Sequence, residues 1–62
     1  ILSSTLIKLS PILEKVTSNK LVLSGIINKR ENEVIQAFSN WIKLSAEDEL
    51  DGWVLLSGKL QT

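Results

Sequence analysis

Residues 40–56, NWIKLSAEDELDGWVLL, contain both tryptophans of the 62-residue chain and decide between two possible folds. Each Trp directly follows a residue that favours turns: Asn40 precedes Trp41, and Gly52 precedes Trp53. Asn tolerates the positive φ of a tight turn, and Gly lets the chain bend sharply. The pattern is typical of tight turns that lead into short strands.

Outward from this stretch, the chain contains further short apolar runs of strand length. The runs are rich in Leu, Ile, Val and Trp, and polar or turn-forming segments separate them. They occupy residues 5–9, 21–27, 34–38, 41–44 and 53–56. Five short strands at this spacing predict an all-β fold, a small five-stranded barrel.

A small all-α helical bundle is the alternative fold. It rests on an apolar face with helical spacing, formed by Val34, Ile35, Phe38, Trp41 and Ile42. A helix through these positions would contain Ser39 and Asn40, whose side chains compete for backbone hydrogen bonds. A second helix starting near residue 46 would meet Gly52 and leave four consecutive apolar residues beyond it. The barrel is therefore preferred.

Composition predicts one small domain over residues 1–62, excised from a larger protein or processed, because the chain opens at Ile1 without Met. Seven Lys and Arg balance seven Asp and Glu, which leaves no surplus of positive charge for nucleic acid. No apolar run approaches the ~18 residues of a spanning helix, so membrane insertion is not expected. A chain without Cys suits either side of a membrane, so the compartment stays open.

Catalytic and metal-binding patterns are missing from the sequence. The chain has no His and no Cys, and its three glycines are isolated. Residues 47–49, together with Asp51, supply four carboxylates, but they lack the ligand spacing of a calcium loop. We expect this acidic segment to be a solvent-exposed hairpin tip. The sequence thus predicts no enzyme, no metal and no cofactor.

The order of motifs resembles a divergent SH3-like domain of the bacterial type over nearly the whole chain. The segments that carry the resemblance are LIKLSP at 6–11, KLVLSGII at 20–27, NWIKL at 40–44 and GWV at 52–54, followed by Leu60. The resemblance implies a five-stranded barrel with a binding function. The first segment has Leu6, Ile7 and Leu9 where peptide-binding SH3 domains have tyrosines, so a proline-rich ligand is not expected.

The predicted ligand-binding residues are Trp41, Trp53, Asn40 and Leu55. At the edge of a sheet, one face of a Trp ring can cover the core while the other contacts a partner. For Trp41, two roles stay open: an aromatic shelf for an extended peptide or glycan, or a plug at one end of the barrel. For Trp53, which begins a run that includes Val54 and Leu55, burial in the core is favoured.

The function predicted from these features is a non-catalytic targeting module that binds a peptide or cell-wall glycopeptide for a larger parent protein. An intracellular adaptor with an atypical SH3 surface is one alternative. The other is an architectural domain that packs on a neighbouring domain or a second copy, since 44% hydrophobic residues in so short a chain leave apolar side chains exposed.

Overall fold

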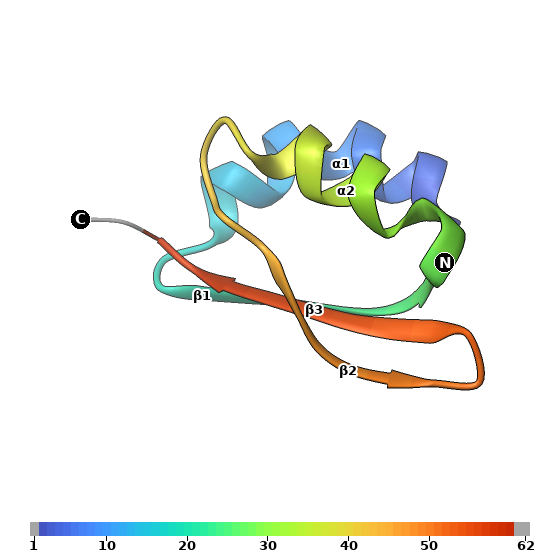
Figure 1. Cartoon of the computed structure of the whole chain (residues 1–62). Helices are drawn as coiled ribbons and strands as arrows, with labels where there is room; N and C mark the ends of the chain where they lie inside the picture. The colour runs from blue at the N-terminus through green and yellow to red at the C-terminus, as the bar shows by residue number, and fades with distance from the viewer. Residues whose placement is uncertain (1, 61–62) are drawn as a thin grey trace.

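A computed structural model describes residues 2–60 of the chain. The elements follow in the order α1 (Ser3–Val16), β1 (Lys20–Ile27), η1 (Asn28–Arg30), α2 (Glu31–Phe38), β2 (Ser45–Leu50) and β3 (Trp53–Lys59). The sheet has the order β1-β3-β2, and β3 is antiparallel to both neighbours. β1 and β2 therefore run parallel to each other, and both helices lie on one face of the sheet (Figure 1).

The prediction of a small β-rich domain rather than a helical bundle is confirmed. The five-stranded barrel is not present, because the described residues form three strands and two α-helices. The strands predicted at 21–27 and 53–56 lie in β1 and β3, but 5–9 and 34–38 are helical and 41–44 form a turn and a loop. The SH3-like type is not confirmed.

Helix α1 runs through residues 10 and 11, where the barrel required a loop corner. Pro11 has no N–H, so Ile7 loses the hydrogen bond that its carbonyl would accept in a regular helix. The helix forms despite this because Leu6 and Ser10 are buried one turn apart and Leu13 packs against the core. Tertiary packing thus outweighs the local preference of the proline.

Helix α2 uses only the first part of the apolar face considered for a helix at 34–42. Val34 and Phe38 are fully buried, and the helix ends at Phe38. There the Ser39 hydroxyl donates a 2.7 Å hydrogen bond to the Gln36 carbonyl. Polar side chains that were expected to break a longer helix therefore lie just beyond its end.

Two glycines with positive φ shape the sheet. Gly25 has φ +75° and lies where the pairing of β1 with β3 shifts register, between Leu23 and Ile26. Asp51 and Gly52 have φ values of +51° and +81° and connect β2 to β3. Two consecutive positive φ angles in a two-residue loop are the signature of a type I′ hairpin turn.

The acidic segment is a strand rather than the tip of a hairpin. Glu47, Asp48 and Glu49 lie in β2, which is exposed along its whole length, so the predicted exposure is correct and the predicted loop is wrong. The Glu49 carboxylate accepts a 3.0 Å hydrogen bond from the Asn28 side chain, and Glu47 accepts one from the Ser57 hydroxyl. The turn, Asp51 and Gly52, comes directly after Leu50, the last residue of the strand.

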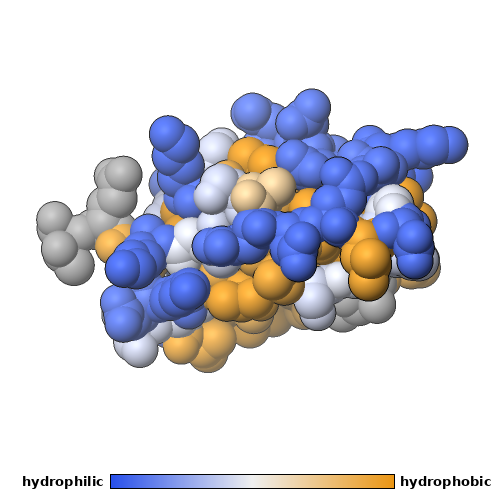
Figure 2. Space-filling model, turned by 60° about the horizontal axis from the view of Figure 1, so that its bottom comes forward, coloured by the Kyte–Doolittle hydropathy of each residue, from blue (hydrophilic) through white to orange (hydrophobic). Residues whose placement is uncertain are grey.

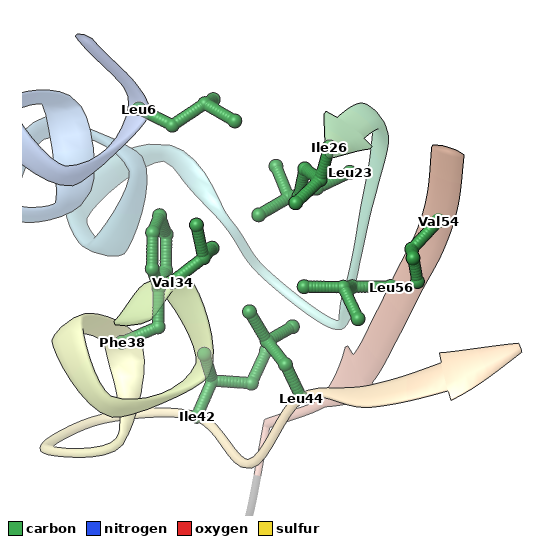
Figure 3. Close-up of a cluster of buried hydrophobic side chains, with 9 residues drawn as sticks. All are labelled: Leu6, Leu23, Ile26, Val34, Phe38, Ile42, Leu44, Val54 and Leu56. Atoms are coloured by element: carbon green, nitrogen blue, oxygen red, sulfur yellow. The ribbon is translucent and has the colours of Figure 1, made fainter. Parts of the chain in front are cut away.

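The core lies between the helices and the inner face of the sheet (Figure 3). All the elements except β2 and the short η1 contribute to it, and so does the loop after α2. Its buried members are Leu6, Leu23, Ile26, Val34, Phe38, Ile42, Leu44, Val54 and Leu56. Neither helix in residues 2–60 is long and apolar enough to span a bilayer.

Candidate functional site

The face of the sheet opposite the helices carries a row of exposed apolar side chains. The register places Ile27 opposite Trp53 and Trp53 opposite Leu50, and directly opposed residues point to the same face. The three side chains are 43%, 52% and 73% exposed. We call Ile27, Trp53 and Leu50 the outer row. In the view turned to bring the bottom of the molecule forward, apolar surface gathers between hydrophilic side chains (Figure 2).

Two hollows meet at the outer row, and both include Trp53 and Gly25. The first has a volume of about 210 Å³ and is lined by Leu2, Ser3, Gly25, Ile27 and Trp53. The second has a volume of about 160 Å³ and is lined by Ser24, Gly25, Asp48, Glu49, Leu50, Trp53, Val54 and Leu55. Trp53 therefore forms a shared wall, with an apolar hollow on one side and carboxylates on the other.

The first hollow lies at the carboxyl end of β1. Ile27 is the last residue of that strand, and Leu2 and Ser3 lie at the start of α1. β1 and β2 run in the same direction but are separated by β3, and both end at this edge of the sheet, with Ile27 and Leu50 on either side of Trp53.

Two of the predicted site residues, Trp53 and Leu55, line the same hollow, but the burial expected for Trp53 is wrong. Along β3, Val54 and Leu56 point into the core, so Trp53 and Leu55 point to the other face. No helix in residues 2–60 covers that face (Figure 1). The apolar run at 53–56 indicated a strand covered on both faces, whereas this sheet is covered on one.

Trp41 and Asn40 lie at a different place, in a hollow that follows α2. The Trp41 indole N–H donates a 2.9 Å hydrogen bond to the Ser10 hydroxyl, and its ring centroid lies 5.8 Å from that of Phe38. The side chain is half-buried and joins the end of α2 to α1. The hollows lined by Trp53 do not include Trp41, and the hollow lined by Trp41 does not include Trp53, so the four predicted site residues form two groups.

Sequence analysis missed Leu2, Ile27 and Leu50 as neighbours of Trp53. The Asp51–Gly52 dipeptide was the signal that could have found Leu50, because it specifies a two-residue hairpin and so places the flanking residues opposite each other. The contact with Leu2 depends on the packing of α1 and has no comparable signal. Within residues 2–60, no three carboxylates converge closely enough to hold a metal ion.

Comparison with known proteins gives a consistent family. The protein-family model described as ribosomal protein L11 methyltransferase (PrmA) matches residues 1–61. The protein of that name from Nitrosomonas europaea is 39% identical over 61 residues, which cover 95% of this chain and 20% of the relative. The one from Bordetella parapertussis is 40% identical over 60 residues, covering 94% and 20%. No solved structure matches the chain.

A shorter match agrees with these. The ribosomal protein L11 methyltransferase of Paraburkholderia phytofirmans is 49% identical over 39 residues, covering 63% of this chain and 13% of the relative. The chain thus spans about a fifth, or less, of the length of the curated relatives it matches. These relatives are named for another protein, ribosomal protein L11, which is consistent with the expectation of a protein partner in its coarse form.

These matches correct the function predicted from the sequence. The prediction of a non-catalytic targeting module is wrong, and so is the prediction that no enzyme is involved, because the family and the relatives are named for a methyltransferase. The sequence misled because no catalytic pattern falls within these 62 residues, so the chain carried no signal of the larger protein's chemistry. The chain belongs to the ribosomal protein L11 methyltransferase family.

Proposed function

We propose that the protein containing this chain transfers methyl groups to ribosomal protein L11. The observation that carries the proposal is the family match over residues 1–61, supported by relatives of that name at 35–40% identity over nearly the whole chain. Because the chain spans about a fifth of those relatives, the activity belongs to the full-length protein.

The contribution that we propose for this chain is a contact with the protein substrate at the first hollow. Leu2, Ile27 and Trp53 provide apolar surface there, beside the carboxyl ends of β1 and β2. An exposed indole is a strong anchor in protein interfaces, where a single Trp can contribute 2 kcal/mol or more. On the other side of Trp53, Asp48 and Glu49 favour a basic segment of the substrate.

The four predicted ligand-binding residues have different places in this proposal. Trp53 and Leu55 belong to it, because they share the second hollow beside the outer row. For Trp41 and Asn40 a role in binding stays a prediction, and the hydrogen bond from Trp41 to Ser10 favours a role in packing. The two tryptophans therefore offer a matched pair of variants.

The activity can be tested in the organism that carries the gene. Ribosomal protein L11 is purified from the ribosomes of the parent strain and of a strain in which the gene is disrupted, and the two intact masses are compared. Loss of whole methyl groups from L11 on disruption supports the proposed activity. Identical masses would show that the full-length protein does not methylate L11.

The contact is tested by restoring the gene with single changes. Trp53→Ala is expected to lower the methylated fraction of L11 at an unchanged level of soluble enzyme, because it removes the shared wall of both hollows. Trp41→Phe, which keeps an aromatic ring and lies outside the two hollows that Trp53 lines, is expected to restore methylation. Full methylation with Trp53→Ala would exclude the contact and leave the proposed activity standing.

A further inference from the structure

We infer that the second hollow, which lies beside Leu55, binds one basic side chain, Lys or Arg, of the protein substrate. Asp48 supplies the negative charge that this basic group meets, and Trp53 supplies the wall along which its stem lies. Such binding presupposes the proposed contact with ribosomal protein L11. It specifies which kind of side chain that contact selects.

A bulge in β1 opens the second hollow. The pairing of β1 with β3 shifts register between Leu23 and Ile26, which leaves Ser24 and Gly25 in a bulge beside Leu55. Gly25 has no side chain to fill the space, and a Cβ built on it would meet no heavy atom within 4 Å. The volume of about 160 Å³ is smaller than the ~300–1,000 Å³ of pockets for small-molecule ligands. The hollow therefore suits a single side chain.

The register of β2 identifies Asp48 as the carboxylate on this face. Asp48 pairs with Leu55, which points away from the core, so both side chains lie on the outer face of the sheet. Glu49 pairs with Val54, which points into the core. The Glu49 carboxylate also accepts the 3.0 Å hydrogen bond from the side chain of Asn28. Asp48 is thus the carboxylate that an occupant of the hollow would meet.

The carboxylate of Asp48 is held in place by the backbone. The N–H of Glu49 donates a 2.8 Å hydrogen bond to Asp48 Oδ1. An ionised carboxylate has two oxygens that accept hydrogen bonds, so Oδ2 can accept one from a basic group. Because the side chain is already positioned, it loses less conformational freedom on binding than a mobile carboxylate would.

The walls of the hollow select a side chain with an apolar stem and a positive end. Trp53 and Leu50 are 52% and 73% exposed and present apolar surface to the stem. Lys and Arg lay their methylene groups along such surface and keep their charge at its margin, where a nearby indole face also attracts a cation. A wholly apolar side chain would bury Asp48 without a partner, and an acidic side chain or a phosphate would be repelled.

The affinity of the full-length enzyme for L11 tests the role of Asp48. Asp48→Asn keeps an oxygen for the Glu49 N–H and removes the charge, so the fold should be retained. The Kd for L11, measured by calorimetry with L11 from the gene-disrupted strain, should rise about fivefold, as loss of an exposed ion pair allows. The rise should shrink at about 1 M salt, which screens the pair.

Asp51→Asn is the matched control for this measurement. It removes the same charge from an exposed turn residue that does not line the second hollow, and it should change the Kd less than about twofold. Equal Kd values for the wild-type and Asp48→Asn enzymes would overturn the inference, and so would equal increases for Asp48→Asn and Asp51→Asn. Intact-mass measurement of methylation in the same samples keeps the proposed activity separate: L11 that is bound but not methylated by the wild type would overturn the activity alone.

Charge reversal on both proteins identifies the bound side chain. Asp48→Lys should weaken binding of wild-type L11 more than Asp48→Asn does, because it places two positive charges together. Among L11 variants with single Lys or Arg residues changed to Glu, one should bind the Asp48→Lys enzyme more tightly than wild-type L11 does, and the wild-type enzyme more weakly. The position that restores binding shows whether the anchor is Lys or Arg. Restoration by none of them would overturn the inference.

Discussion

At the scale of single residues, Trp41 and Trp53 differ in what surrounds their indole rings. Trp41 is half-buried, donates its N–H to Ser10 and contacts Phe38, whereas Trp53 stands 52% exposed on the outer row. An indole with a satisfied N–H between two helices stabilises their packing. The exposed indole of Trp53 does not have that role, so substitutions of the two residues should have different effects on stability.

The hydrogen bond between Trp41 and Ser10 should appear as coupling in a double-mutant cycle. Trp41→Phe and Ser10→Ala are each expected to lower the free energy of unfolding by about 1 kcal/mol, because each leaves a polar group without its partner. The double variant should lose less than the sum of the two. Urea denaturation of the full-length enzyme measures all four members of the cycle, and strict additivity would contradict the bond.

Gly58 is a position where a methyl group has no room. A Cβ at this residue would collide with the backbone carbonyl oxygen of Lys43, in the loop that follows α2. Gly58→Ala is expected to cost about 1–3 kcal/mol of stability, as insertions into packed regions do. Lys59→Ala, at the next and exposed residue, serves as the control. Equal unfolding midpoints for the two variants in urea would show that the loop moves aside freely.

At the scale of elements, the strands that could be predicted from the sequence are those whose apolar runs lie in the sheet. The segments at 21–27 and 53–56 were correct because Leu23, Ile26, Val54 and Leu56 combine apolar character with β-branched or strand-compatible shape. α1 was missed because Pro11 indicated a break in secondary structure at that point. Which side of α1 is buried is defined only when α2 packs against it. Local propensity carries no information about that contact.

The acidic strand β2 and the candidate site show the same limit of prediction from sequence. The sequence of β2, SAEDEL, has low strand propensity, and the strand forms because the Asp51–Gly52 turn brings it alongside β3. Trp53 and Leu55 are site residues predicted from the sequence, and their role in binding stays a prediction. Their exposure could not be predicted from the sequence, because it depends on which face of the sheet the helices cover.

The turn between β2 and β3 can be tested by changing its backbone preference. Gly52 has φ +81°, a conformation that costs a residue with a Cβ roughly 1–2 kcal/mol. Gly52→Ala should therefore lower the melting temperature of the full-length enzyme. Asp51→Asn should leave the melting temperature nearly unchanged, since Asn suits a type I′ turn equally well. A melting temperature that is the same for both variants would argue against the I′ geometry.

At the scale of the whole molecule, the helices within residues 2–60 cover one face of the sheet and leave the other open. The outer row and Val22 leave the other face apolar, in a chain whose net charge is zero. Exposed apolar surface without net repulsion favours association. The isolated 62-residue chain should therefore differ in its tendency to associate from the same segment in the full-length protein.

We expect the isolated chain to self-associate in sedimentation velocity as its concentration rises. Leu50→Lys should reduce this association, because it places a charge in the outer row. Val16→Lys changes a similarly exposed residue at the end of α1, 70% against 73%, and should leave the association as it is. A chain that stays monomeric at every concentration, or an equal response of the two variants, would show that the outer row is not an adhesive surface.

The position of β3 between β1 and β2 has a consequence for synthesis on the ribosome. β3, the central strand, is translated after both of its neighbours, β1 and β2. Neither neighbour can form its hydrogen-bonded ladder with β3 until residues 53–59 have emerged. The local hairpin with β2 can close quickly, whereas pairing with β1 must first close a loop that contains α2. During that interval β1 presents Leu23 and Ile26, which are buried in the folded chain, without the strand that pairs with them. Nascent chains at this stage are exposed to aggregation and are suitable clients for chaperones.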